Sequence, residues 1–255
     1  MEIVIIGSGN VATQLAKAFC KHGHPIKQVF SKQSANAKAL ADTVKAESIS
    51  NLSDLDLEAD LYLIAVSDTA IAQVISEMPE IKKGIVVHTS GATPIEILQR
   101  FDKAGVLYPA QSISRQVEID ITGIPFGIEA NSSETSESLF NLLTPIATRI
   151  FSCNSKQRLA LHVSAVLVNN FPNALFSMAQ EILERENMDF DLLRPIILET
   201  ANKVQNHLPT EVQTGPAVRN DFSTINRHLQ FLSYSNELTQ IYQHLSDFII
   251  KSRHK

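Results

Sequence analysis

The feature that most constrains this chain is a glycine-rich turn close to its N-terminus. Residues 3–6 (IVII) form a continuous β-branched run, which is typical of a strand buried on both faces. Gly7, Gly9 and Ala12 follow with the spacing G-x-G-x-x-A, and an amphipathic helical pattern begins at the same place. In a dinucleotide-binding turn, the first glycine permits the tight bend, the second lets a pyrophosphate approach the backbone, and the small third residue allows close helix packing. The context predicts such a turn, and an ordinary glycine-rich strand–helix connection is the alternative.

The carboxyl ends of the predicted strands supply the candidate cofactor-binding residues, because ligands of open α/β sheets bind at that edge. The helix that begins in the turn also offers backbone N–H groups and a partial positive charge to phosphates. The candidates lie in the turn and after three later strands: Gly7, Ser8, Gly9, Asn10, Val11, Ser31, Lys32, Val66, Ser67 and Ser90. His88, at the end of one of these strands, either faces the nicotinamide end of the site or packs inside the fold.

The segment after the second predicted strand distinguishes between the two nicotinamide cofactors. A site for NAD usually has an Asp or Glu there, which accepts a hydrogen bond from the ribose 2′-hydroxyl. No carboxylate occurs between Lys27 and Asn36, and the position holds Ser31 and Lys32. A hydroxyl donor and an ammonium group suit a 2′-phosphate. We therefore expect NADP as the cofactor, although Lys32 could also be a solvated loop residue.

Strand-like and helix-like segments alternate through the first 150 residues, an order that indicates parallel strands joined by right-handed crossovers. The later expected strands are residues 26–30, 61–66, 84–88 and 105–108, with candidate edge strands at 126–129 and 148–151. A helix is expected around residues 97–101. The sequence thus predicts an α/β fold, with a doubly wound parallel Rossmann sheet in residues 1–152 as the dinucleotide-binding domain.

Residues 153–255 show helical patterns throughout, so we expect an all-α C-terminal domain for substrate binding and dimerisation. One long helix is expected from Lys156 to Arg185, with a kink or interruption at Pro172. Its first half is apolar nearly all round, which predicts a buried central helix. A later helix is expected to begin near Pro216, because proline suits the first helical turn. The apolar stripe of the last helix adds surface to bury, and we expect a homodimer through this domain.

Three polar side chains interrupt the apolar pattern of the long helix. His162, Asn169 and Asn173 are seven and four residues apart, which places them on one face of a straight helix. Buried polar groups need partners, so a polar cleft between the domains would explain the stripe. Histidine exchanges protons near neutral pH, and His162, with Asn169 beside it, is the candidate catalytic group toward a carbonyl or imine. A structural network with buried water is the alternative.

Composition and charge argue against several classes of protein. The chain has 22 Lys and Arg against 27 Asp and Glu, so its negative net charge disfavours a broad nucleic-acid-binding surface. Cys20 and Cys153 form no disulfide framework and no metal-binding pattern. We see no apolar run that approaches the roughly 20 residues of a membrane helix, and no signal peptide. We expect a cytoplasmic protein with no metal, no membrane and no nucleic-acid partner.

Five segments together carry a resemblance to a known family: GSGNVA, AVSD, HTSGA, LHVSAVLVNN and TGPAVRND. The chain resembles proteins with a Rossmann-type NADP-binding domain and a helical C-terminal domain of unknown function. More distantly, it is similar to pyrroline-5-carboxylate reductase, ketopantoate reductase and the 6-phosphogluconate dehydrogenase group. In those enzymes the helical domain supplies substrate-side groups and much of the dimer contact.

Two departures limit what this resemblance implies about the reaction. The β-hydroxyacid and ketopantoate enzymes have a catalytic Lys with an Asn four residues later, where this chain has His162 and Val166. Relatives often have a His-Pro pair after the sixth strand, where this chain has Tyr108 and Pro109. We expect an NADP-dependent oxidoreductase acting on a small carbonyl or imine compound. A non-catalytic NADP-binding regulator or interaction protein is the alternative.

Overall fold

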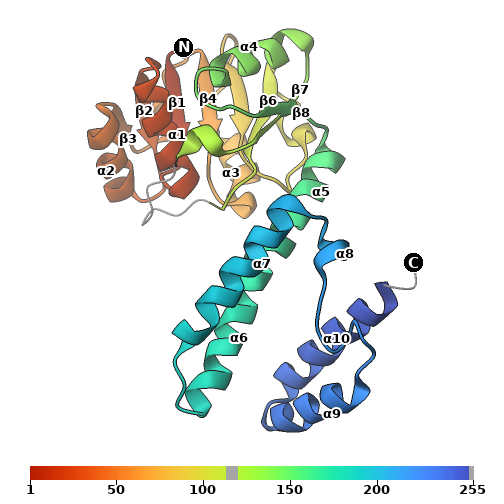
Figure 1. Cartoon of the computed structure of the whole chain (residues 1–255). Coiled ribbons are helices and arrows are strands. Elements are labelled where there is room, and N and C mark those ends of the chain that lie inside the picture. The colour runs from red at the N-terminus through yellow and green to blue at the C-terminus, as the bar shows by residue number, and fades with distance from the viewer. Residues whose placement is uncertain (113–119, 253–255) are drawn as a thin grey trace. The chain divides into compact units, whose positions relative to one another are not determined.

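The computed structural model describes residues 1–112 and 120–252, which form two compact units (Figure 1). The first unit is Met1–Phe171 and the second is Pro172–Lys255. The last strand ends at Ser152, where the sequence pattern changes from sheet to helix. The helical residues that follow it, up to Phe171, belong to the same compact unit as the sheet.

The first unit is built on an eight-stranded sheet with the order β3-β2-β1-β4-β5-β6-β7-β8. Strands β1 to β6 are parallel, β7 is antiparallel to β6, and β8 is parallel to β7. The strands are β1 (Ile3–Ile6), β2 (Ile26–Phe30), β3 (Glu47–Ile49), β4 (Leu61–Ile64), β5 (Ile85–His88), β6 (Ala104–Pro109), β7 (Phe126–Ala130) and β8 (Ile150–Ser152). Four helices connect them: α1 (Asn10–Lys21), α2 (Ser34–Val44), α3 (Asp68–Glu77) and α4 (Ser133–Leu143).

Both faces of the sheet are covered, as the sequence pattern predicts for a doubly wound fold. Ile3 and Ile5 of β1 pack in a cluster with α1, α2 and α4, whereas Val4 and Ile6 pack in a second cluster with α3. All four side chains are completely buried. The continuous apolar run in β1 therefore reflects burial on two faces, and the α/β fold class with a Rossmann sheet is confirmed.

Two details of the sheet differ from the sequence prediction. The expected helix around residues 97–101 is only a short 3-10 turn, Ile95–Leu98, which begins after the extended Pro94. Strand β3, at the edge of the sheet, was not predicted because only Ile49 of its three residues is buried. Short edge segments carry too little apolar pattern to be recognised.

The long helical stretch runs from Ser155 to Arg185 with a change of geometry in the middle. It consists of α5 (Ser155–Ala165), a π-helical turn η4 (Val166–Asn170) and α6 (Phe171–Arg185). The π turn ends at Asn170, two residues before Pro172, whose missing N–H cannot complete an ordinary helical hydrogen bond. The predicted interruption at Pro172 is thus a widened turn within one helix.

The expectation that this helix is a buried core helix is wrong for the single chain. In α5, Arg158 is the buried residue, while Leu159 and Val163, and Leu167 in the π turn, are about half exposed. An 18-residue window of this stretch has a mean hydropathy of 1.3, and by length and composition alone the helix is long enough to cross a membrane. Our expectation of no such segment therefore fails, although apolar helices of water-soluble proteins pass the same test.

The second unit is entirely helical in its described part. Its helices are α7 (Arg194–Asn206), α8 (Pro209–Val212), α9 (Phe222–Phe231) and α10 (Asn236–Ser252), with most of α6 preceding them. The helix expected from Pro216 begins instead at Phe222. Gly215 and Asn220 have positive φ angles of 111° and 55°, which break the helical path, and Asp221 accepts a hydrogen bond from the Thr224 N–H as the N-cap.

Candidate functional site

The glycine-rich turn has the backbone geometry that its sequence predicts. Gly7 follows β1 with φ at 127°, and its N–H donates to the carbonyl of Phe30 at 2.8 Å. A Cβ on Gly7 would lie 2.1 Å from the carbonyl oxygen of Ala65. Only glycine therefore fits this position, because both the φ angle and the neighbouring strand exclude a side chain.

Gly9 has a different role in the same turn. It is the N-cap of α1 with an ordinary φ of −74°, and a Cβ there would meet no protein atom within 4 Å. The position therefore faces open space in front of the helix N-terminus, where a bound group could approach the backbone. A side chain at this position would fill that space.

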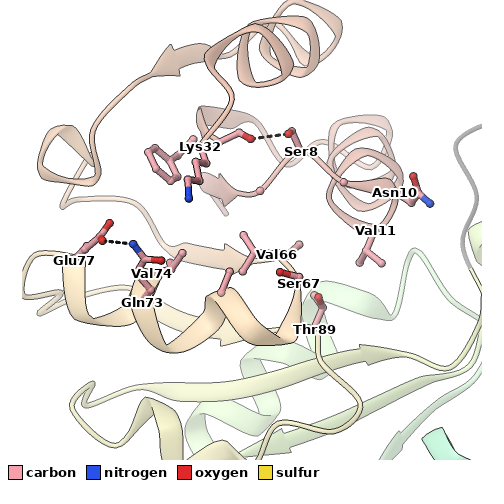
Figure 2. A pocket seen from close by; sticks show the side chains of 16 residues that line it. Ser8, Asn10, Val11, Lys32, Val66, Ser67, Gln73, Val74, Glu77 and Thr89 are labelled. Atoms are coloured by element: carbon pink, nitrogen blue, oxygen red, sulfur yellow. Dashed lines mark hydrogen bonds between the residues drawn. The ribbon is translucent and has the colours of Figure 1, made fainter.

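The open space is a cavity of about 620 Å³ at the carboxyl ends of the central strands (Figure 2). It contains nine of the ten candidate cofactor residues: Gly7, Ser8, Gly9, Asn10, Val11, Ser31, Lys32, Val66 and Ser67. Further lining residues, which were not among the ten candidates, lie at the end of β2, after β4, on α3 and after β5: Phe30, Ala65, Ala70, Gln73, Val74, Glu77 and Thr89. Only contacts in three dimensions identify these, since none belongs to the glycine motif.

The β1 and β2 ends of the cavity are tied together by a hydrogen bond. The Ser8 hydroxyl donates to Ser31 Oγ at 2.8 Å. Lys32 extends into the cavity from the loop after β2, and the pair formed by Gln73 and Glu77 on α3 lies on another wall (Figure 2). A hydroxyl and an ammonium group thus stand beside each other at the end of β2, where an NAD site usually has a carboxylate.

The residues present fit a nicotinamide dinucleotide. The bend of Gly7, the open approach at Gly9 and the N-terminus of α1 provide a diphosphate cradle, and the volume is in the usual range for a ligand site. Among residues 1–112 and 120–252, no group of three or more His, Cys, Asp or Glu side chains is arranged to hold a metal ion.

The loop after β5 leads away from the cavity and is held by its own polar groups. Thr89 lines the cavity, but Ser90 does not; its Oγ accepts from the N–H groups of Ala92 and Thr93 at 3.1 and 2.9 Å. His88 is completely buried, and its Nδ1 accepts from the Ser90 N–H at 3.2 Å. Burial, and secondly the nearby Arg158 charge, lower the pKa of His88 to about 4. His88 is therefore a packed, neutral residue that shapes this loop.

His162 lies against the same loop, on the second turn of α5. Its Cγ and Nδ1 are 2.7 Å from the place where a Cβ of Gly91 would be. Its Nδ1 is also 3.2 Å from the hydroxyl of Tyr108, at the end of β6. No local sequence pattern indicates this contact, because 54 residues separate the two side chains.

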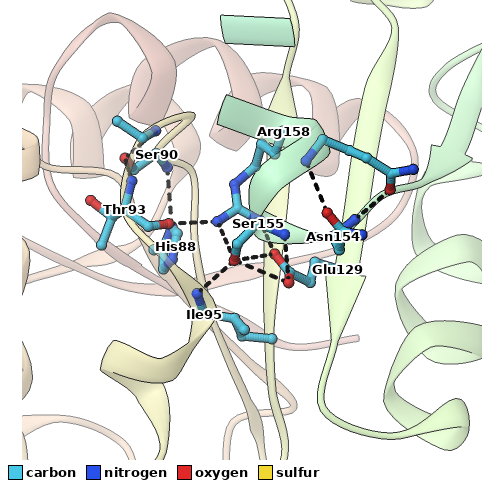
Figure 3. Close-up of polar contacts among 10 residues, drawn as sticks. His88, Ser90, Thr93, Ile95, Glu129, Asn154, Ser155 and Arg158 are labelled. Atoms are coloured by element: carbon cyan, nitrogen blue, oxygen red, sulfur yellow. Dashed lines mark hydrogen bonds and ion pairs between the residues drawn. The ribbon is translucent and has the colours of Figure 1, made fainter. Parts of the chain in front are cut away.

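An ion-pair network fixes the start of α5 on the sheet (Figure 3). The guanidinium of Arg158 pairs with Glu129 of β7 and donates to the carbonyl of Thr93 at 2.5 Å. Ser155, the first residue of α5, donates its N–H to the Glu129 carboxylate at 2.8 Å. Because Arg158 precedes His162 by about one turn, this network sets the position of the histidine.

The polar stripe predicted on the long helix is not preserved as a unit. The π turn lies between His162 and Asn169 and changes the helical register, so the straight-helix prediction does not apply. The side chain of Asn169 is exposed, and within the described residues no hydrogen bond joins it to His162. Asn173 lines a separate groove of about 610 Å³ in the second unit, between α6 and α7.

The doubly wound sheet, the left-handed glycine and the cavity at the helix N-terminus define a protein with a Rossmann-like fold. Family comparisons agree: a Rossmann-like domain matches residues 1–111, and DUF2520, a domain of unknown function, matches residues 124–249. The Bacteroides fragilis protein BF3122, named as a putative NADP oxidoreductase, is 37% identical over 98% of each chain, with a TM-score of 0.89. The chain belongs to this family, which joins a Rossmann-like domain to DUF2520.

More distant proteins share the fold. Protein TM1727 from Thermotoga maritima is 17% identical over 96% of this chain and 99% of its own, with a TM-score of 0.77. A reductive aminase from Aspergillus terreus, in complex with NADPH and ethyl-5-oxohexanoate, is 13% identical over 98% of this chain and 94% of its own, with a TM-score of 0.75. A comparison with curated proteins finds no match.

Proposed function

We propose that this protein is an NADPH-dependent reductase of a small carbonyl or imine compound. The observation that carries the proposal is the course of the loop after β5. Thr89 lines the dinucleotide cavity, and His162 packs on Gly91 two residues later. A histidine thus packs on the same loop that contributes Thr89 to the cavity wall. The relative named as an NADP oxidoreductase and the NADPH-bound reductive aminase support the same class.

The chain's own residues would bind and orient the cofactor, and NADPH when bound would supply the hydride. The turn around Gly9 would hold the diphosphate on backbone amides, as the open approach allows. Ser31 and Lys32 would bind the 2′-phosphate through a hydroxyl donor and a charge. Val66 and Ser67 would line the path toward the nicotinamide, because they follow β4 in the cavity wall.

His162 would provide or accept the proton at the substrate. It is half buried and anchored by Gly91 and Tyr108, so its ring is oriented before a substrate arrives. Asn169 is exposed one π turn later, and we retain it as a second polar contact of the substrate.

Steady-state oxidation of NADPH against 2-oxo acids, lactones, cyclic imines and ketones tests this proposal. We expect turnover with at least one class, and loss of it in His162→Gln with unchanged NADP+ affinity. Tight binding of NADP+ without turnover of any probe would contradict the reductase. That result would instead favour a dinucleotide-binding regulator. The absence of the catalytic Lys–Asn pair found in the β-hydroxyacid and ketopantoate enzymes is consistent with such a role.

We also propose that a second copy of the chain covers the apolar helices of the C-terminal half. No residue of α6 or α7 is buried within one chain, yet helices of this length gain most of their stability from packing. Exposed apolar side chains on the long helix and α7 include Val163, Leu167, Val168, Phe171, Leu175, Ile196, Leu198 and Val204. Light scattering should give a dimer at micromolar concentration. A monomer, or cosedimentation with phosphatidylcholine vesicles, would contradict this proposal.

A further inference from the structure

We propose that Tyr108 and His162 form one proton-delivery unit. The hydroxyl of Tyr108 donates to Nδ1 of His162, and the opposite nitrogen, Nε2, presents its proton to the reacting carbonyl or imine. This inference rests on the proposed function and adds a positioning residue to it, since Tyr108 acts through the histidine rather than on the substrate.

The geometry of the two rings supports this arrangement. The hydroxyl oxygen and Nδ1 are 3.2 Å apart, and the rings meet edge to face at 80° with centroids 6.0 Å apart. Tyr108 is only 5% exposed, so it is a packed residue, and we assign the contact with the substrate to His162. Among the residues described, the side chain of His162 makes no other hydrogen bond, which leaves Nε2 available.

Gly91 makes the close approach of the histidine possible. Three atoms of His162, Cβ, Cγ and Nδ1, lie within 2.8 Å of the place where a Cβ on Gly91 would be. Any other residue at position 91 would push the ring away from Tyr108. The glycine therefore places the imidazole on the loop that begins at Thr89 in the cavity wall.

Burial of Tyr108 favours its hydroxyl as the donor. Burial raises the pKa of Tyr108, so the phenol keeps its proton at neutral pH and can donate it to Nδ1. The nearby Arg158 acts in the opposite direction and would stabilise a transient phenolate, while Cys153 adds to the upward shift. The remaining titratable groups of this region are Glu129, which is paired with Arg158, and the neutral His88.

The proton transfers balance the reduction. NADPH, when bound, would supply a hydride to the carbon of the C=O or C=N bond, and the electron pair of that bond would move to the oxygen or nitrogen. This atom takes the proton from Nε2 of His162, while Nδ1 takes the proton of Tyr108. Water then returns a proton to Nε2, and the proton on Nδ1 goes back to the phenolate, which restores the starting tautomer. An alkoxide is a far stronger base than a phenolate, so the transfer runs in this direction.

The tautomer of His162 tests the pair without any substrate. In full-length protein labelled with ¹⁵N-histidine, long-range ¹H–¹⁵N spectra distinguish the protonated from the unprotonated ring nitrogen, and His162→Gln assigns the signals. We expect the Nε2–H tautomer in the wild type and a shift toward a mixture in Tyr108→Phe. The control is Tyr62→Phe, which removes another buried hydroxyl, hydrogen-bonded to the Asp56 carbonyl at 2.6 Å. An Nδ1–H tautomer, or no change in Tyr108→Phe, would overturn the proposal.

Kinetics with the best probe of the panel separate the pair from the proposed function. Tyr108→Phe should lower kcat roughly tenfold or more with little change in KM, and Tyr62→Phe should leave both unchanged. An unchanged kcat in Tyr108→Phe overturns the proton-delivery role. Absence of turnover in the wild type contradicts the reductase itself, and the tautomer measurement then still decides whether the two side chains are coupled.

Discussion

Arg158 of α5 and Glu129 of β7 form a buried ion pair, with side chains only 1% and 13% exposed. The glutamate also accepts hydrogen bonds from the N–H and hydroxyl of Ser155, so both charges have several partners. The pair joins the sheet to the first turn of the helix that carries His162. Because the burial of charges costs free energy, the pair is weak evidence for a gain in stability. We interpret it as a contact that defines the position of α5 on the sheet.

Removal of one charge of this pair should destabilise the protein strongly. In Glu129→Gln the guanidinium of Arg158 stays buried without its counter-charge, and we expect the free energy of unfolding to fall by about 3–5 kcal/mol. Chemical denaturation measures the change. Glu134→Gln, at an exposed glutamate paired with Lys103, is the matched control and should change little. Equal effects of the two variants would show that the buried pair does not fix α5.

The two glycines of the opening turn should respond differently to the same substitution. Gly7→Ala places a methyl group against the Ala65 carbonyl at a positive φ, so we expect a loss of roughly 2 kcal/mol or more of stability. In Gly9→Ala the added methyl group contacts no protein atom, so the variant should fold normally. The methyl group should nevertheless weaken NADP+ binding roughly tenfold, because it occupies the space in which the diphosphate approaches the backbone. Thermal unfolding and calorimetric titration measure the two effects. Normal NADP+ affinity in Gly9→Ala would argue against a diphosphate at this position.

Lys32 should determine the preference between the two cofactors. Lys32→Ala removes a charge from the cavity wall, so the affinity for NADP+ should fall roughly tenfold while that for NAD+ changes little. Lys82→Ala, at a well-exposed lysine outside the cavity, is the control. Titration of both cofactors into both variants measures the preference. A parallel loss of NAD+ affinity in Lys32→Ala would mean that the lysine does not contact a 2′-phosphate.

His88 should make the protein sensitive to acid. Its pKa is about 4 in the folded state, below the ordinary value near 6.5, so the unfolded chain binds more protons between these values. Stability should therefore fall as pH decreases from about 6.5 to 4, by about 1–3 kcal/mol from this residue. His88→Asn keeps an acceptor for the Ser90 N–H, but it has no group that titrates in this range. The variant should therefore lack the loss of stability between about pH 6.5 and 4 that comes from His88. Identical pH profiles of unfolding for wild type and variant would contradict the assignment.

Local sequence patterns predicted the parts of the site that depend on a single turn. The bend at Gly7, the approach at Gly9 and the Ser31–Lys32 pair follow from residues close in sequence, and the structure gathers them around one cavity. The same holds for β1, whose uninterrupted apolar run indicates two buried faces.

Features that depend on distant residues could not be predicted in this way. The contact of Tyr108 with His162 and the burial of Arg158 arise from the packing of α5 on the sheet, which no periodicity reveals. The apolar character of α5 predicted burial, but hydropathy does not tell whether the same chain, a second copy or another partner covers a helix. The prediction that His162 and Asn169 share one helix face assumed about 3.6 residues per turn. The π turn before Pro172 has a different period, so the prediction does not hold there.

The most direct test of the account is a crystal structure of the protein grown with millimolar NADP+. We predict that the diphosphate lies on the backbone amides at Gly9, with the 2′-phosphate between Ser31 and Lys32. A cavity that excludes the dinucleotide, or a diphosphate bound away from the N-terminus of α1, would contradict the central claim.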